Sequence, residues 1–242
     1  MMIPQMVPWF GEEEATAVTE YMRSGGWLTE FHKTREFESA IATYTGVAHC
    51  IVTNNGTISL TLAALACGVQ AADDVIVPNY TMIASPNSVF MIGANPIFVD
   101  VELETLCLDI EKTKAALMPK TRAIMLVTAN GRYPKAGIEP FVRLAEERGL
   151  ILIEDAAQSL GSRFPDGRHI GRAGKIGSFS FSASKVITTG QGGCLITDDD
   201  EVATRLRRLK DFGRVAGAID ISDSIGYNFK FTDLQACVVS SK

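Results

Sequence analysis

The sequence predicts an α/β fold, a three-layer α/β/α sandwich around a mainly parallel central sheet. Short apolar runs of strand length recur along the 242 residues and alternate with amphipathic helical patterns. Such alternation places strands in the middle and helices on both faces. Hydrophobic residues make up 46% of the chain, enough for a sizeable core in one large domain.

The N-terminal part is predicted to be helical before the first strand. Apolar residues recur at helical spacing over residues 12–23 and 34–44, within a helical segment that we place at residues 1–46. A short strand near residues 50–53 and a helix over 57–67 come next. Further strands are predicted at 75–77, 96–101, 123–128, 150–154, 177–181 and 194–197, with a helix over 138–148.

Composition and charge argue against a nucleic-acid-binding protein. The formal net charge is −5, and a nucleic-acid surface needs an excess of basic residues. The one dense basic cluster is interpreted as the solvated face of a helix. It consists of Arg205, Arg207, Arg208 and Lys210.

The cysteines and the termini favour a cytoplasmic protein. The five cysteines lie largely within apolar stretches and lack paired metal-ligand spacing, so we expect reduced core residues and a reducing compartment. The three histidines are scattered, without a zinc arrangement, and no metal site is predicted. No apolar stretch approaches the length needed to span a bilayer, and residues 1–14 lack a signal-peptide pattern.

Lys185 is the first candidate for chemistry. It follows the hydroxyl-rich stretch 178–184 and precedes the glycine-rich stretch 190–193. A lysine that attacks an aldehyde must be unprotonated, which burial or a nearby cation favours. An ordinary surface lysine after a strand is the alternative that this segment alone leaves open.

Asp155 makes the chemical interpretation more specific. It stands at the end of the apolar run 149–153, which is typical of a buried parallel strand. The carboxyl ends of such strands are where open α/β sheets bind ligands. An aspartate and a lysine facing one cavity are what pyridoxal phosphate requires, an acid for the pyridine nitrogen and an amine for the aldehyde. Strand alternation points the neighbouring Glu154 to the opposite face.

Residues 54–59 offer a turn into a helix at which a phosphate could bind. The free N–H groups and the positive dipole end of a helix favour an anion. A simple helix cap is the other interpretation. The segment has a single glycine, so it does not match the dinucleotide fingerprint, and residues 174–176 lack the hydroxyl that completes a P-loop.

The chain resembles the DegT/DnrJ/EryC1/StrS sugar aminotransferases, which have the aspartate-aminotransferase-like fold, nearly from end to end. Each shared motif is weak alone, whereas their order and combination are specific. The motifs are residues 26–29, 37–38, 54–57, 75–78, 98–100, 120–124, 154–158, 180–185, 192–193, 226–228 and 235–236.

The resemblance implies pyridoxal 5′-phosphate as cofactor and a role for each matching residue. Lys185 would form the Schiff base and then shuttle a proton, and Asp155 would pair with the pyridinium nitrogen. Gln158 would approach the ring oxygen. The remaining cofactor contacts would come from Thr57, the Ile58 backbone and Ser180 at the phosphate, Met82 at the ring face, and Asn228 from a neighbouring subunit.

The chain departs from the family pattern at two places in the predicted site. Many relatives stack an aromatic side chain on the cofactor ring, where this chain has Met82, a thioether that can still cover the ring. Relatives usually have a histidine after the strand that corresponds to residues 123–127. This chain has residues 128–130, Thr-Ala-Asn, in that place.

The chain also differs from the family in length. Relatives continue into a smaller C-terminal domain, so residues 1–242 are interpreted as the cofactor-binding large domain with that small domain absent.

The implied function is transfer of an amino group, with glutamate as expected donor, to a nucleotide-linked 4-keto-6-deoxy sugar for lipopolysaccharide, O-antigen or other glycan synthesis. The overall resemblance favours a GDP-linked perosamine-type product, made by a homodimer with a shared active site. Sugar dehydration is one alternative, although relatives with that activity carry histidine in place of Lys185. A non-catalytic, regulatory or truncated member that keeps the fold is the other.

Overall fold

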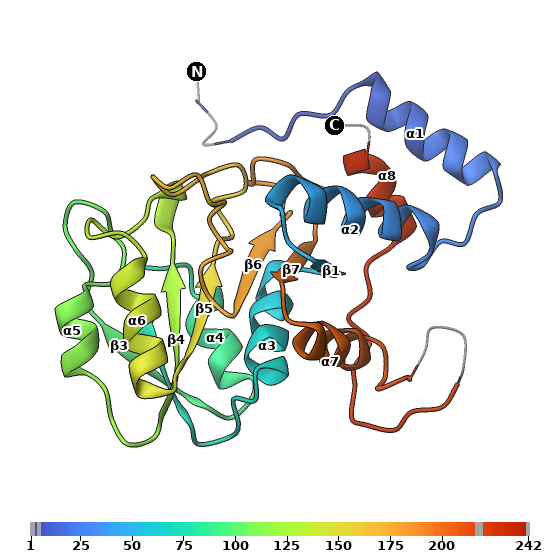
Figure 1. The fold of residues 1–242 in the computed structure, drawn as a ribbon. Coiled ribbons are helices and arrows are strands. Elements are labelled where there is room, and N and C mark those ends of the chain that lie inside the picture. Colours follow the sequence, from blue (N-terminus) through green and yellow to red (C-terminus); the bar gives the residue numbers. More distant parts are fainter. Residues whose placement is uncertain (1–2, 4–5, 216–219, 241–242) are drawn as a thin grey trace.

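The computed structural model describes residues 3, 6–215 and 220–240 and shows an α/β sandwich (Figure 1). Parts of two predictions, the absence of a leader over 1–14 and the chain end at 241–242, lie outside the described residues. Within the part of the chain that is described, no helix is long and apolar enough to cross a membrane.

The central sheet has seven strands among the described residues, in the order β1-β7-β6-β5-β4-β2-β3. Strand β7 is antiparallel to both β1 and β6, and every other neighbouring pair is parallel. The predicted mainly parallel sheet is therefore confirmed. The strands are β1 His49–Thr53, β2 Asp74–Pro78, β3 Asn95–Val99, β4 Thr121–Val127, β5 Ile151–Asp155, β6 Ile176–Ser180 and β7 Gly193–Thr197.

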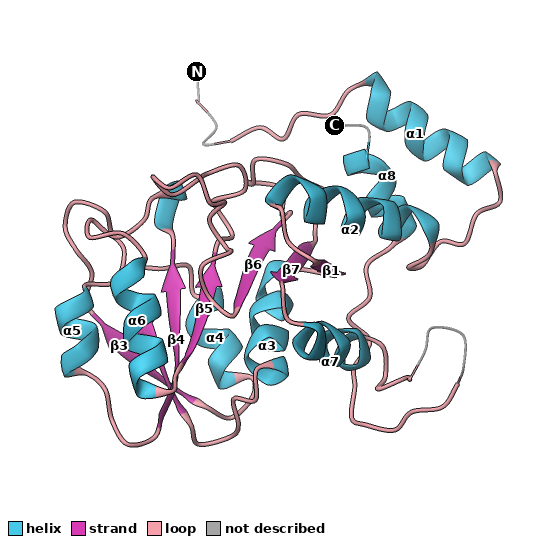
Figure 2. Cartoon of the chain, in the orientation of Figure 1, coloured by secondary structure: helices cyan, strands magenta, loops and turns pink. Residues whose placement is uncertain are grey.

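Helices cover both faces of the sheet, which completes the three layers (Figure 2). Helices α2 and α6 contribute to one buried apolar cluster, and α3, α4 and α7 contribute to the other. The helices are α1 Glu12–Arg23, α2 His32–Thr45, α3 Gly56–Ala66, α4 Ala84–Phe90, α5 Ile110–Ala115, α6 Glu139–Arg148, α7 Asp200–Lys210 and α8 Asp233–Ser240, with a 3-10 turn η1 at Ala129–Gly131.

Strand alternation divides the core between the two faces. Cys50 and Val52 of β1 pack into the cluster of α2 and α6, while Ile51 between them packs into the cluster of α3 and α7. Successive side chains of a strand point to opposite faces, so an apolar run of this kind is buried on both sides. The predicted strands and helices are present with ends shifted by up to two residues. Helices α4 and α5 were not predicted.

The basic cluster of α7 is not a uniformly solvated face, which corrects the sequence interpretation. Lys210 is only 2% exposed. Its Nζ lies 2.7 Å from Glu30 Oε1 and 3.3 Å from Glu38 Oε1, and it donates a hydrogen bond of 3.0 Å to the Val52 carbonyl. Arg207 also contacts Glu38, at 3.1 Å. These acidic partners neutralise a cation inside the protein.

Asp233, the first residue of α8, ties the C-terminal helix to the N-terminal ones. Its fully buried carboxylate accepts hydrogen bonds from the backbone N–H groups of Phe31, Lys33 and Thr34 and from the hydroxyls of Thr34 and Tyr21. Burial alone would raise the pKa of this carboxyl, but the hydrogen bonds outweigh burial and lower it. A charged group thus satisfies the free N–H groups at the start of α2.

Candidate active site

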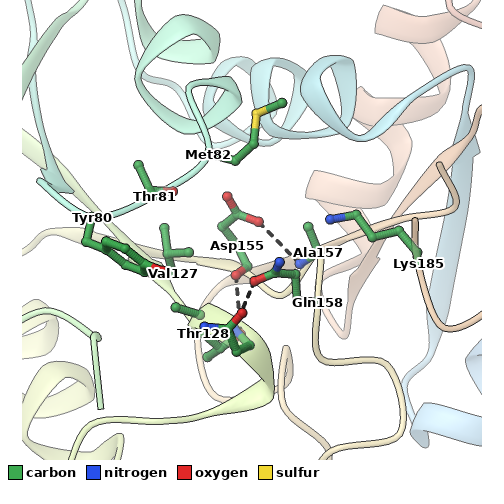
Figure 3. Close-up of a pocket in the computed structure, with 11 residues that line it drawn as sticks. Tyr80, Thr81, Met82, Val127, Thr128, Asp155, Ala157, Gln158 and Lys185 are labelled. Carbon is green, nitrogen blue, oxygen red and sulfur yellow. Dashed lines mark hydrogen bonds between the residues drawn. The ribbon is translucent and has the colours of Figure 1, made fainter. Parts of the chain in front are cut away.

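A cavity of about 240 Å³ opens at the edge of the sheet where the parallel strands end (Figure 3). Its walls come from segments that follow β2, β4, β5 and β6. This is the edge at which open α/β sheets bind ligands. The lining residues are Tyr80, Thr81, Met82, Val127, Thr128, Ala129, Asn130, Asp155, Ala157, Gln158 and Lys185.

Asp155 ends β5 and supplies a buried carboxylate to this cavity. Ser85 Oγ donates to its Oδ2 at 2.7 Å, and the Ala157 N–H donates to its Oδ1 at 3.2 Å. Burial raises the pKa of Asp155, and the Ser85 hydrogen bond is the largest influence that opposes the rise. The neighbouring Glu154 points the other way, as predicted, and accepts from the N–H groups of Gly171, Ala173 and Gly174.

Lys185 follows β6 and extends into the same cavity. Its side chain points toward Asp155 and Ala157 (Figure 3). Burial lowers the pKa of Lys185, while the negative charge of Asp155 acts in the opposite direction. Desolvation disfavours the ammonium form, so a larger fraction of neutral amine is available for attack on a carbonyl carbon. The sequence prediction that one cavity receives both side chains is confirmed.

Gln158 lies at the rim with its amide orientation defined. Its Oε1 accepts a hydrogen bond of 2.8 Å from the N–H of Asn130. Asn130 has φ 56°, a left-handed conformation that asparagine tolerates better than most residues. Because the Gln158 oxygen is occupied, the Nε2 group is the donor left for a ligand in the cavity.

A second polar region lies where α3 begins against the end of β6. Asn55 caps α3 by accepting the Ile58 N–H at 2.9 Å. A Cβ on Gly56 would lie 2.8 Å from Ser180 Cβ, so only glycine lets the two segments approach this closely. Thr57, at the second position of α3, and Ser180 therefore lie on adjoining segments at the positive end of a helix.

The Asn55 cap bears directly on one predicted phosphate contact. The Ile58 N–H is already donated to Asn55, and it would have to leave this cap to reach an anion. The roles of Thr57, Ile58 and Ser180 at a phosphate stay predictions.

Met82 and Asn228 differ in their relation to the cavity. Met82 lies on its rim and is 68% exposed, with its thioether above Asp155 in Figure 3. Asn228 is exposed, pairs through the backbone with Asp211, and is not among the described residues that line this cavity. A contact from Asn228 to a neighbouring subunit's cofactor stays a prediction.

Sequence reasoning missed Ser85. It is fully buried, and its hydroxyl contacts the carboxylate at the centre of the site. Ser85 is one helical turn beyond Thr81, and this spacing was the available signal. Without α4 in the prediction, that spacing had no structural meaning.

Comparison with known proteins identifies the family. The model of the DegT/DnrJ/EryC1/StrS aminotransferase family matches residues 8–242. The chain belongs to this family. The resemblance inferred from the motifs is thereby confirmed. The aminotransferase fold is confirmed as well, because solved aminotransferases from Psychrobacter cryohalolentis and Streptoalloteichus hindustanus superpose on the chain with TM-scores of 0.90 and 0.91.

Three individual comparisons show how far the similarity extends. GDP-perosamine synthase of Caulobacter vibrioides is 40% identical over 203 residues, which cover 84% of this chain and 54% of that protein. L-glutamine:2-deoxy-scyllo-inosose aminotransferase of Streptomyces kanamyceticus is 36% identical and covers 93% of the chain and 56% of that protein. S. venezuelae DesV, solved with a ketimine intermediate, superposes with TM-score 0.88 at 33% identity, over 94% of this chain and 60% of its own.

The chain thus spans little more than half the length of these similar proteins.

Proposed function

We propose that this family member is the catalytic large domain, residues 1–242, of a pyridoxal-phosphate-dependent aminotransferase. The observation that carries the proposal is that Lys185 and Asp155 line one cavity, with a helix start nearby. An amine and a buried carboxylate match the aldehyde and the ring nitrogen of that cofactor, and the positive end of a helix would suit its phosphate. The residues present therefore fit the group.

Each residue of the site has a distinct task in this proposal. When bound, the cofactor supplies an aldehyde and a ring that accepts electrons. Lys185 Nζ provides the attacking amine and is the group placed to take up and return the proton that leaves the substrate. Asp155 keeps the ring nitrogen protonated, and Gln158 Nε2 donates to the ring oxygen. Met82 covers the ring face, where its soft thioether replaces an aromatic contact.

The substrates we propose are glutamate as amino donor and a nucleotide-linked 4-keto-6-deoxy sugar as acceptor. Support comes from GDP-perosamine synthase as a 40% identical relative. A keto-cyclitol is the second candidate acceptor, because an L-glutamine:2-deoxy-scyllo-inosose aminotransferase is 36% identical over 93% of this chain. The product would serve glycan synthesis, such as O-antigen, in the cytoplasm.

We also propose a homodimer in which Asn228 of one copy reaches the cofactor phosphate of the other. Large apolar side chains are exposed beside the cavity mouth, including Tyr80, Met82, Ile83 and Val186. Exposed apolar groups clustered at one site favour a protein interface. A two-fold dimer would cover them, and Asn228 is exposed and away from its own cavity.

Two other functions account less well for the site. A sugar dehydratase of this family would carry histidine at the position of Lys185. A non-catalytic member would have no reason to keep the pair of Lys185 and Asp155 in one cavity, because burying a carboxylate costs stability and such a member would gain no chemistry from it.

The decisive experiment is chemical labelling of the cofactor lysine. Borohydride reduction of the protein with pyridoxal phosphate, followed by peptide mapping, should modify Lys185. Lys175, which pairs with Asp199 on the surface, is the internal control and should stay unmodified. A label on Lys175 alone, or none, would overturn the assignment.

The acceptor and the dimer are tested separately. A half-reaction with glutamate, followed by a panel of nucleotide-linked keto sugars and a keto-cyclitol, identifies the acceptor. Sedimentation of wild type and Asn228→Ala, with and without pyridoxal phosphate, tests the shared site. A monomer that holds the cofactor as tightly as a dimer contradicts it.

A further inference from the structure

Ser85 is a buried hydroxyl at the centre of the site. It belongs to α4, is fully buried, and lies 2.7 Å from two oxygen atoms, Asp155 Oδ2 and Thr81 Oγ1. Buried hydroxyls are nearly always hydrogen-bonded, but the choice of partner here is informative. One of its partners is the carboxylate of the site, and the other lines the cavity.

The chemistry of the three groups fixes the direction of these hydrogen bonds. An ionised carboxylate only accepts hydrogen bonds, so the single hydroxyl proton of Ser85 is donated in the hydrogen bond to Asp155. Thr81 must then donate its own proton to the Ser85 oxygen. The result is a directed chain from Thr81 through Ser85 to Asp155. Chains of this kind polarise their members and strengthen the last bond.

This chain connects two separate walls of the cavity. Thr81 and Met82 belong to the segment between β2 and α4, whereas Asp155 ends β5. The Ser85 bond to Oδ2 is shorter than the 3.2 Å bond from Ala157 to Oδ1. Oδ2 is therefore the more firmly held oxygen, and the plane of the carboxylate depends on Ser85.

The charge of Asp155 also depends on its donors. A buried carboxylate prefers its neutral form unless hydrogen bonds or a cation favour the anion. The groups that face Asp155 and favour the anion are Ser85, the Ala157 N–H and the Lys185 amine. The Lys185 amine has to give up its charge before it can attack a carbonyl carbon. Ser85 and the Ala157 N–H are the neutral donors that stay in place, and Ser85 makes the shorter hydrogen bond.

We propose that Ser85 is a positioning residue that holds the Asp155 carboxylate ionised and oriented toward the ring nitrogen of the cofactor, and links it through Thr81 to the segment that carries Met82. The inference rests on the proposed function, because it gives Asp155 a ring nitrogen to meet. Ser85 itself does not touch the cofactor in this scheme.

The test compares two buried serines of the same helix. Ser85→Ala removes the hydrogen bond to Asp155. Ser88→Ala is the matched control, since Ser88 is equally buried but donates at 2.7 Å to the Ser85 backbone carbonyl. Equilibrium titration should show pyridoxal phosphate binding weakened by about tenfold in Ser85→Ala, as expected for a lost hydrogen bond to a charged group. Ser88→Ala should stay within about twofold of wild type.

A cofactor analogue isolates the ring nitrogen. In the carbocyclic analogue of pyridoxal phosphate, a C–H group replaces that nitrogen, so Asp155 has no ring partner. Wild type and Ser85→Ala should then bind the analogue equally. The bound-cofactor absorbance of Ser85→Ala should also change with pH over a different range from wild type. Ser85→Thr, which keeps the hydroxyl, should restore both affinity and spectrum.

The outcomes separate this inference from the function on which it rests. If wild type does not attach pyridoxal phosphate at Lys185, the proposed function and the inference both fail. If wild type attaches it and Ser85→Ala binds the cofactor like Ser88→Ala, only the inference fails. An equal loss for cofactor and analogue would show a purely structural role. Should Ser85→Ala not fold, Ser85→Cys keeps the volume with a weaker donor and must show the same selective loss.

Discussion

Replacement of Lys210 by methionine is expected to destabilise the protein far more than its place on a basic helix suggests. The Nζ group contacts Glu30, Glu38 and the Val52 carbonyl from a position that is 2% exposed. Methionine has a similar volume, so little cavity forms. The loss comes from the acidic partners, which stay in place without their cation.

The magnitude follows from what remains around Glu38. Breaking a buried ion pair from one side costs roughly 3–5 kcal/mol. The Val52 N–H at 2.9 Å and Arg207 at 3.1 Å still stabilise Glu38, so we expect the lower end of that range. A loss of about 3 kcal/mol lowers Tm by roughly 6–12 °C in a domain of this size. Urea unfolding and calorimetry measure both quantities.

A matched substitution on the surface provides the control. Lys114 pairs with Glu111 at 2.7 Å, and both side chains are largely exposed. Lys114→Met should change the free energy of unfolding by less than about 0.5 kcal/mol, because exposed pairs contribute little. If Lys210→Met cost no more than Lys114→Met, the argument for a buried cation at this position would be refuted.

Three further predictions concern the site and the N-terminal helices. Gly56→Ala should leave the fold intact but weaken cofactor binding at least severalfold by titration, because its Cβ would lie 2.8 Å from Ser180 Cβ. Met82→Phe should tighten binding by roughly two- to tenfold through an added aromatic contact, and unchanged affinity would place Met82 away from the ring. The lowered pKa of Asp233 means that its contribution is present above about pH 3.8 and is lost as pH falls through the folded-state pKa. Asp233→Asn should therefore be less stable than wild type at neutral pH, with a gap that closes in acid unfolding series.

Local patterns were enough to predict the framework of the site. Helix α1 was predicted with the bounds that the structure has, and the alternation of β5 placed Glu154 and Asp155 on opposite faces. Lys185 and Asp155 were brought together because parallel strands end at one edge of the sheet. Periodicity and strand direction are properties of short segments, so the sequence expresses them directly.

Contacts between residues far apart in the sequence could not be predicted from these local patterns. Lys210 was assigned to solvent because its partners Glu30 and Glu38 are far away in the chain. Helix α4 was missed because it has only seven residues, with Pro86 inside and little apolar periodicity. Ser85 was missed with it. In each case tertiary contacts, rather than local preference, decided the structure.

The position of β1 has a consequence for how the chain folds during synthesis. This strand pairs only with β7 in the sheet, with His49 opposite Thr197. It therefore cannot pair until most of the described chain has been synthesised. Its apolar residues Ile51 and Val52 stay unprotected meanwhile. Closing so long a loop is slow. We therefore expect ribosome-bound fragments that end before β7 to remain sensitive to protease at β1 and to recruit chaperones.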